Sequence, residues 1–435
     1  MAPNGQFETL DLGSLTIVAM LDALLRHTIR HGMLRVIDPW GRSATYGDGT
    51  GPDTIIRIHD LKTAIKILFD PQMAVGEAYM DGTLTVETGT IYDVLDIALR
   101  NLGMKPFKYP LSGLTEGIRT AFRRIAQFNP AGRSRSNVAH HYDLSDRLYD
   151  LFLDPDRQYS CAYVMDPSDT IEAAQAQKKR HLAAKLLLKP EQKILDIGSG
   201  WGGLGLYLAA FAAGDVTGLT LSSEQYRVSN QRATEAGMKD RVRFKMQDYR
   251  AEHGLYDRIV SVGMFEHVGV NHYDDYFKMV ARCLKKDGIA LIHSIGRADG
   301  PGHTNPWIAK YIFPGGYSPA LSEVIPAIER AGLIITDIEI LRLHYAETLR
   351  LWRERFEQNR DAIRALYDER FCRMWEFYLI TSELCFRHNG QMVFQIQLAK
   401  RPDSVPITRD YITEFEKAYP PAHALAPLTD YSRAA

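Results

Sequence analysis

The chain has few cysteines, and they show no ordered spacing. Among its 435 residues are only four, at positions 161, 283, 372 and 385, and none belongs to a CxxC pair. This pattern excludes a zinc ribbon and a disulfide framework, the two uses of cysteine that regular spacing reveals. We therefore predict no metal site, and we expect a reducing, cytoplasmic environment.

Long hydrophobic runs are also missing. No stretch reaches the roughly 20 apolar residues that a membrane-spanning helix needs. The apolar run at residues 15–25 is interrupted by Asp22, and no basic residue precedes it, so we expect no signal peptide. The sequence predicts a soluble protein.

An excess of charge of one sign is absent from the whole chain. Lys and Arg number 52 and Asp and Glu 53, which argues against nucleic-acid binding by bulk charge. Residues 103–137 differ from this average, with seven basic residues against one acidic residue: Lys105, Lys108, Arg119, Arg123, Arg124, Arg133 and Arg135 against Glu116. Such a segment can bind an anionic lipid surface, but the pattern alone favours a solvated interdomain linker.

The length and these shifts in composition predict two domains, a linker between them and a C-terminal extension. Residues 1–102 are interpreted as a small α+β accessory or dimerisation domain, with helices at 15–32, 61–69 and 91–102 and short strands near 33–38 and 54–59. The remaining parts are a basic linker at 103–137, a catalytic domain at 138–400 and a C-terminal extension at 401–435.

The catalytic domain alternates strands with helices. Strands are predicted at 193–197, 215–219, 242–246, 256–262 and 288–294, and helices at 143–153, 171–188, 204–213, 224–236 and 273–284. This alternation is typical of an α/β fold with a mainly parallel, doubly wound sheet. Ligands of such sheets bind at the carboxyl ends of the strands.

A glycine-rich turn follows the first of these strands. The run from Ile194 to Gly203 reads Gly-x-Gly-x-Gly-Gly after Asp196, and its glycines at 198 and 200 allow positive φ and close approach of a ligand. The turn resembles the nucleotide-binding turn of class I S-adenosylmethionine (SAM) methyltransferases. A tight strand–helix turn without a ligand is the alternative.

Polar residues follow the other strands. Asp248 is placed either to accept a hydrogen bond from an adenine amino group or to cap a turn, and Thr220 or Gln225 is placed to bind ribose hydroxyls. Glu266, with His267 beside it, and His293 follow two strands of the same sheet, which makes them candidates for proton transfer.

Cys161 lies ahead of the sheet, in the run Tyr159-Ser-Cys-Ala-Tyr163. It is interpreted either as a nucleophile or as a buried, inert thiol, and the second is the commoner case beside aromatic residues. Spacing alone leaves both interpretations open.

Eight motifs in order resemble the cyclopropane-fatty-acyl-phospholipid synthases and their mycolic-acid relatives. They begin at Val138, Tyr159, Leu195, Leu219, Phe265, His293, His344 and Phe386, and include Leu195-Asp-Ile-Gly-Ser-Gly-Trp-Gly-Gly and Phe265-Glu-His-Val-Gly. Residues 76–82 are similar to the N-terminal module of the members that act on phospholipids.

The resemblance implies a class I SAM methyltransferase fold with an acyl-binding cap, acting on the cis double bond of unsaturated phospholipid acyl chains. It also implies a bound bicarbonate as the base. The base would be held by Cys161, Glu266, His293, Ile295 and Tyr345. SAM would contact Tyr159, Ser160, Asp196, Gly198, Gly200, Thr220, Leu221, Gln225, Gln247 and Asp248.

The same resemblance suggests a homodimer that associates with the inner face of the cytoplasmic membrane. Residues 301–320 and 345–380, rich in aromatic side chains, are expected to wall the acyl channel. A cyclopropane is the expected product. A methylene- or methyl-branched chain is the alternative within the family, and a non-catalytic lipid-binding relative is the alternative outside it.

Overall fold

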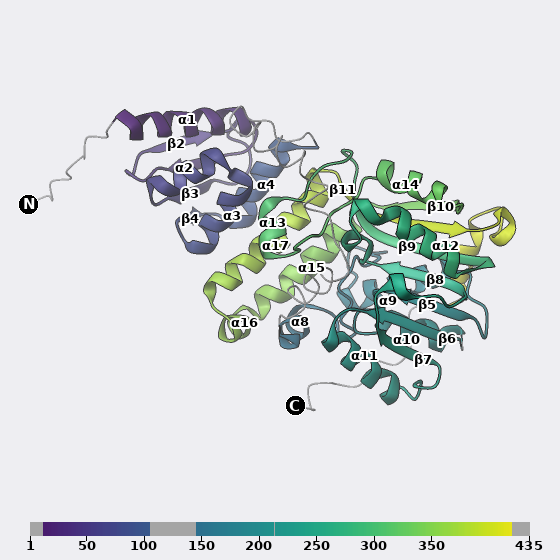
Figure 1. Ribbon diagram of the computed structural model, residues 1–435. Helices are drawn as coiled ribbons and strands as arrows, with labels where there is room; N and C mark the ends of the chain where they lie inside the picture. The colour runs from purple at the N-terminus through teal and green to yellow at the C-terminus, as the bar shows by residue number, and fades with distance from the viewer. Residues whose placement is uncertain (1–11, 105–144, 213, 420–435) are drawn as a thin grey trace, which may run out of the picture.

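The computed structural model describes residues 12–104, 145–212 and 214–419. The linker predicted at 103–137 and the motif that begins at Val138 fall almost entirely outside these residues. Two sheets organise the described residues, one of four strands and one of seven (Figure 1). They fall within the two domains predicted from the sequence.

The N-terminal sheet has the order β2-β1-β3-β4 and carries four helices. Local signals set the helix ends: Asp60 caps one helix by accepting from the Thr63 N–H, and Thr90 with Asp93 forms a capping box on another. The elements are α1 (Leu12–Thr28), β1 (Leu34–Ile37), β2 (Ser43–Tyr46), β3 (Thr54–Ile58), α2 (Leu61–Phe69), α3 (Pro71–Asp81), β4 (Leu84–Thr88) and α4 (Ile91–Leu102).

The C-terminal sheet has the order β10-β11-β9-β8-β5-β6-β7. The last five in this order are parallel, and β11 is antiparallel to both of its neighbours. Their bounds are β5 (Lys193–Ile197), β6 (Asp215–Thr220), β7 (Val242–Met246), β8 (Tyr256–Val262), β9 (Leu284–Arg297), β10 (Ile334–Leu341) and β11 (Gln391–Ala399). The chain leaves β5 towards β6 and returns on the other side through β8, so a ligand crevice opens at the carboxyl end of β5.

Helices cover this sheet and build a cap beyond its carboxyl edge. Against the sheet lie α9 (Ile171–Lys185), α10 (Gly203–Ala212), α11 (Ser223–Glu235), α12 (Tyr273–Cys283) and α14 (Leu321–Arg330). The last helix, α18 (Asp410–Ala418), packs on α9. The cap is formed by α8 (Asp146–Phe152), α13 (Pro306–Tyr311), α15 (His344–Gln358), α16 (Arg360–Leu366) and α17 (Glu369–His388). Short 3-10 turns follow β7 and β8: η1 (Tyr249–Ala251), η2 (Phe265–His267) and η3 (Val270–His272).

The parallel α/β fold predicted from the sequence is confirmed, with local differences. The helix predicted at 171–188 ends at Lys185 because Leu187 turns the chain with a φ of 48°. The strand predicted at 288–294 is the middle of β9, a longer strand that begins at Leu284. Strands β10 and β11 were not predicted.

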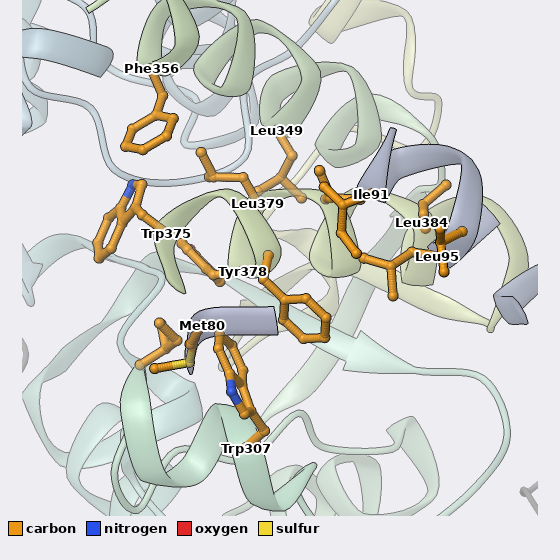
Figure 2. Close-up of a cluster of buried hydrophobic side chains, with 14 of the residues drawn as sticks. Met80, Ile91, Leu95, Trp307, Leu349, Phe356, Trp375, Tyr378, Leu379 and Leu384 are labelled. Carbon is orange, nitrogen blue, oxygen red and sulfur yellow. The ribbon is translucent and has the colours of Figure 1, made fainter. Parts of the chain in front are cut away.

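The N-terminal domain packs directly on the cap. In Figure 2, Met80, Ile91 and Leu95 of the N-terminal domain meet the cap residues Trp307, Leu349, Phe356, Trp375, Tyr378, Leu379 and Leu384 in one buried cluster. Helices α3 and α4 contact α17, which lies between the two sheets in Figure 1. In the described part of the chain, no helix combines the length and the apolar character that crossing a membrane requires.

Candidate active site

The turn after β5 is shaped by glycine. Gly198 has a φ of 83° and Gly200 a φ of 52°, and a Cβ added at Gly198 would lie 2.7 Å from the Cβ of Met264. The N–H groups of Gly198 and Ser199 both donate to the Leu219 carbonyl at 2.9 Å, which ties the turn to the end of β6. Only glycine fits position 198 without a shift of the backbone.

A cavity opens over this turn at the carboxyl ends of β5, β6, β7 and β8. All ten residues that the resemblance assigned to SAM line it: Tyr159, Ser160, Asp196, Gly198, Gly200, Thr220, Leu221, Gln225, Gln247 and Asp248. They come from separate segments of the chain, and the sheet brings them together. We call this space the first cavity.

Asp196 supplies a buried acceptor to the first cavity. Burial raises the pKa of its carboxyl group to about 7, and its Oδ2 has no hydrogen-bond partner among the described residues. A buried carboxylate oxygen without a donor is costly. A ligand that brings a donor, such as the ammonium group of SAM, would satisfy it, so the residues present fit this group.

The neutral residues after β6 form a small network. The Thr220 hydroxyl donates to Oε1 of Gln225 at 2.8 Å, and Ser222 caps α11 by accepting from the Gln225 N–H. Asp248 caps η1, accepts from the Arg250 N–H and forms an ion pair with the Arg250 guanidinium at 2.6 Å. The turn-capping role of Asp248 is therefore observed, and its contact with adenine stays a prediction.

A second cavity adjoins the first. Tyr159, Ser160, Gly263 and His267 line both of them, so the two spaces share one wall. Burial lowers the pKa of His267 to about 4, which leaves its ring uncharged in this wall. The five residues that the resemblance assigned to the base all line the second cavity: Cys161, Glu266, His293, Ile295 and Tyr345.

Glu266 is half-buried in the short turn η2 that follows β8. Its Oε1 accepts a hydrogen bond from the Ile295 N–H at 2.7 Å, whereas its Oε2 is buried and has no partner among the described residues. Burial raises the pKa of this carboxyl group to about 7. The backbone of Ile295 thus orients Glu266, and one oxygen is left for a ligand.

His293 is an uncharged imidazole. Burial, reinforced by the positive charges of Lys178 and Lys185, lowers its pKa to about 3. Its Nδ1 lies 3.1 Å from Nε2 of Gln395 on the neighbouring strand β11. A neutral imidazole carries a single N–H, so its tautomer decides what it can offer to a ligand.

Cys161 does not have the surroundings of a nucleophile. The thiol is buried, burial raises its pKa well above the usual range, and Sγ donates to the Ala162 carbonyl at 3.3 Å. A nucleophilic cysteine needs a stabilised thiolate. Of the two interpretations left open by the sequence, the structure favours the inert thiol.

The cap closes the second cavity with apolar and aromatic side chains. Ile308, Phe313 and Tyr317 of the segment predicted to wall an acyl channel line it, together with Tyr345. Trp307 does not, because its ring packs against Phe377 and lies under Gly76 of the N-terminal domain. That segment therefore serves two purposes, one at the cavity and one at the domain interface.

Sequence reasoning missed the polar residues beneath the site. Lys178 is fully buried, and its Nζ donates to Oε1 of Gln158 at 2.6 Å and to Oγ of Ser160 at 2.9 Å. Burial lowers its pKa to about 8. A signal was present in the sequence: Gln175, Lys178, His181 and Lys185 recur at helical spacing, which predicts one polar face, although not that this face is buried.

No group of three or more acidic, His or Cys side chains in the described ranges could hold a metal ion.

Comparison with known proteins identifies the family. Residues 130–396 match the family described as mycolic acid cyclopropane synthetase. A cyclopropane-fatty-acyl-phospholipid synthase of Escherichia coli is 36% identical over 357 residues, covering 81% of this chain and 89% of that protein. This chain belongs to the mycolic acid cyclopropane synthetase family.

Other relatives agree with this membership. Tuberculostearic acid methyltransferase UfaA1 of Mycobacterium tuberculosis is 36% identical over 404 residues, covering 88% of this chain and 91% of that protein. The solved cyclopropane synthase MmaA2 of M. tuberculosis is 33% identical with a TM-score of 0.59, covering 63% of this chain and 99% of that structure. Mycolic acid cyclopropane synthase CmaA1, solved with SAH and CTAB, is 32% identical with a TM-score of 0.58, covering 62% of this chain and 99% of that structure.

The family resemblance predicted from eight motifs is thus confirmed, and the protein is a SAM-dependent methyltransferase. The N-terminal domain is a separate matter. Residues 23–105 match a domain family whose description assigns no function.

Proposed function

We propose that the protein transfers the methyl group of SAM to a cis double bond in the acyl chain of an unsaturated phospholipid, and that loss of a proton then closes a cyclopropane ring. The observation that carries this proposal is the pair of adjoining cavities. One fits SAM, and the other holds a carboxylate oxygen without a partner, on Glu266, beside the neutral ring of His293.

The bonds that form and break set what the site must do. The electron pair of the alkene attacks the methyl carbon of the sulfonium, and the sulfur leaves with its bonding pair as S-adenosylhomocysteine. A carbocation remains on the acyl chain, and one proton must leave the transferred methyl group before the ring can close. The enzyme must therefore exclude water, tolerate a cation and accept one proton.

The apolar wall of the second cavity meets the first two needs. Ile308 and Phe313 replace water around the acyl chain, which protects the cation from quenching. The faces of Tyr317 and Tyr345 can stabilise positive charge by cation–π interaction. Among the described residues that line this cavity, none is a lysine or an arginine, so no such positive charge in the wall opposes the cation.

The residues present fit a small anion that accepts the proton. Bicarbonate, when bound, would supply that base. The unpartnered Oε2 of Glu266 would accept the hydroxyl proton of such an anion, and His293 and Tyr345 would donate hydrogen bonds to its oxygens. Ile295 holds Glu266 through its backbone N–H, and Cys161 contributes to the wall without attacking.

The deciding experiment is turnover of SAM with vesicles of cis-unsaturated phospholipid, followed by mass and proton NMR analysis of the released acyl methyl esters. Upfield ring-methylene protons would support the cyclopropane. Vinyl protons or a new methyl branch would mean that the cation rearranges before proton loss, the alternative kept open by the similarity to tuberculostearic acid methyltransferase. SAM binding without any acyl product would favour a lipid-binding protein.

We further propose that the protein works as a homodimer at the inner face of the cytoplasmic membrane. The support for membrane association is the seven-to-one excess of basic residues at 103–137. Flotation with anionic vesicles should weaken as salt rises and weaken again in the Arg123→Glu, Arg124→Glu variant. Vesicle binding that is unaffected by salt and by the double substitution would exclude electrostatic attraction of the basic segment to the membrane. Sedimentation of the full chain tests the homodimer.

A further inference from the structure

Gln395 is a polar residue in the middle of an apolar strand. It lies on β11 directly opposite His293 of β9, and its side chain is completely buried. Its Nε2 lies 3.1 Å from Nδ1 of His293, and no other hydrogen bond joins that ring to a described residue. A buried amide on a central strand requires a reason, because burying it without full hydrogen bonding is costly.

The direction of this hydrogen bond follows from the chemistry of the amide. An amide nitrogen donates and does not accept, so Nδ1 of His293 must be the acceptor. The single proton of the neutral ring is then on Nε2. Because Nδ1 is engaged by Gln395 and the ring lines the second cavity, Nε2–H is the group left for a ligand there.

The opposite orientation of the amide is less favourable. Oε1 of Gln395 is buried and has no partner among the described residues, so the observed orientation leaves one acceptor unsatisfied. Rotating the amide would place two N–H hydrogens where Oε1 now lies, and would leave both without an acceptor. The observed orientation leaves Oε1 and the second Nε2 hydrogen without a partner among the described residues, and the rotated one would leave both Nε2 hydrogens without one. The two orientations thus differ by one unpaired oxygen against one unpaired N–H, and buried N–H groups are left unpaired more rarely than carbonyl oxygens, which favours the observed orientation.

We propose that Gln395 is a positioning residue that holds His293 in the Nε2-protonated tautomer, so that the ring presents an N–H donor to an anion in the second cavity. The identity of that anion rests on the proposed function, whereas the tautomer does not. Gln395 acts through His293 and does not itself line the cavity.

The charged groups around His293 keep the ring neutral, which gives the tautomer its importance. Lys178, His181 and Lys185 on α9 oppose protonation of the ring, Glu339 on β10 favours it, and burial is the largest effect. An imidazolium would donate from both nitrogens whatever the partner of Nδ1. A neutral ring donates only where its partner directs the proton.

Two substitutions separate the roles of the amide. Gln395→Met keeps the shape and removes the donor, so both tautomers become accessible. In Gln395→Glu, the new carboxyl group and Nδ1 of His293 share one proton at low pH, and Nε2–H can still donate to the anion. As pH rises and that proton is lost, the remaining carboxylate holds the ring proton on Nδ1, and Nε2 turns a lone pair towards the anion.

The first test is ring-¹⁵N NMR of histidine-labelled full-length protein, with the His293 signals assigned by their loss in His293→Gln. We expect the proton on Nε2 in the wild type, a mixture of tautomers in Gln395→Met and the proton on Nδ1 in Gln395→Glu at high pH. A wild-type ring protonated on Nδ1 would overturn the proposal. This readout needs neither bicarbonate nor lipid, so it stands apart from the proposed function.

The second test is the bicarbonate dependence of turnover in carbonate-depleted buffer. Losing one hydrogen bond to an anion should raise the bicarbonate concentration for half-maximal rate about tenfold in Gln395→Met, with SAM affinity unchanged. The rate of Gln395→Glu should fall as pH rises, unlike that of the wild type. An unchanged bicarbonate requirement and pH profile in both variants would contradict the assigned role.

A matched control is available on the same strand. Gln397 is buried on the same face of β11, two residues further along, where its Nε2 donates to the Lys185 carbonyl at 2.5 Å and to the Tyr411 hydroxyl at 2.9 Å, and not to His293. Gln397→Glu makes the same chemical change without touching the ring, so it should keep the wild-type tautomer and bicarbonate requirement. If wild-type turnover shows no bicarbonate dependence at all, the proposed base is wrong, and the NMR result still decides the tautomer.

Discussion

Glu266 combines burial with an incomplete set of hydrogen bonds, and this gives it a pH signature. Its folded-state pKa of about 7 lies above the ordinary value of 4.5, so the neutral form is favoured in the folded protein. The raised pKa of Glu266 contributes to the free energy of unfolding, and this contribution is fully present below pH 4.5 and is lost as pH rises through about 7. The contribution of Glu266 to the stability of the ligand-free protein should therefore be lost between pH 5 and pH 8.

Replacing Glu266 with Gln should remove that part of the pH dependence. Between pH 5 and pH 8, we expect the unfolding free energy of ligand-free Glu266→Gln to fall by about 2 kcal/mol less than that of the wild type, as measured by urea titration. The Ile295 bond survives, because the amide oxygen can still accept it. Turnover should fall at least about a hundredfold, since the acceptor oxygen is gone.

The control for this prediction is Glu235→Gln, the same change at an exposed position of α11. It should leave both the pH dependence of stability and the turnover unchanged. An equal shrinkage in the control, or full activity in Glu266→Gln, would contradict the role assigned to this carboxylate.

Cys161 gives the opposite expectation. The thiol is buried and protonated, and it donates a hydrogen bond to the Ala162 carbonyl, which a serine hydroxyl can also use. Cys161→Ser should therefore keep turnover within about tenfold, because no thiolate attack is lost. Cys283→Ser is the matched control, since that buried thiol donates to the Glu252 carbonyl and lines neither cavity. Loss of turnover in Cys161→Ser, with turnover kept in Cys283→Ser, would mean that Cys161 acts as a nucleophile.

At the scale of elements, prediction from the sequence succeeded where the signal is local. The strands at 193–197, 242–246 and 256–262 have the bounds expected from their apolar runs, and the helix at 91–102 is set by its own capping box. The strand ends then brought Glu266 and His293 to one cavity, because neighbouring parallel strands end at the same edge.

The same reasoning failed for elements that depend on distant partners. Strand β11 inserts between β9 and β10, and its two buried glutamines break the apolar pattern of a central strand. Only the register, which pairs Gln395 with His293, explains the first of them. Lys178 was missed for a similar reason, because its partners Gln158 and Ser160 lie in the irregular segment before α9, whose path back over the helix no local pattern predicts.

The turn between β5 and α10 contains Gly198 and Gly200, both with positive φ, and of these two only Gly198 is also in close contact with another side chain, so we expect their replacement by alanine to have different costs. Gly198→Ala meets both a positive φ and a contact 2.7 Å from the Cβ of Met264, whereas a Cβ at Gly200 would meet nothing within 4 Å among the described residues. We expect a loss of about 2–4 kcal/mol of unfolding free energy for Gly198→Ala and about 1–2 kcal/mol for Gly200→Ala. Urea unfolding followed by circular dichroism measures both, and equal losses would mean that Met264 moves aside freely.

At the scale of the whole molecule, the N-terminal domain is bound to the cap by polar and apolar contacts together. Glu77 accepts hydrogen bonds from Lys310 at 2.6 Å and from Tyr311 at 2.8 Å, and Tyr79 donates to Glu376 at 2.8 Å. Helix α13, which carries Lys310 and Tyr311, also carries Ile308 into the second cavity. The sequence indicated two domains but could not show that they share a core.

Gly76 tests how tightly this interface is packed. In an ordinary helix, Gly→Ala stabilises by about 1 kcal/mol. At Gly76 the added Cβ would lie 2.5 Å from Nε1 of Trp307 and 2.9 Å from Cε1 of Phe377. Gly76→Ala should therefore destabilise the full chain, by about 1–2 kcal/mol, because overpacking outweighs the gain in helix propensity.

The Trp307→Leu background supplies the second half of this test. A smaller side chain at 307 relieves the contact of the new Cβ with Trp307 and leaves the contact with Phe377, so Gly76→Ala should cost less stability in the Trp307→Leu background than in the wild type. The double-mutant cycle should then give a coupling of at least about 1 kcal/mol in urea unfolding. Purely additive effects would mean that α3 and α13 do not press on each other in solution, and that the N-terminal domain is not held against the wall of the second cavity.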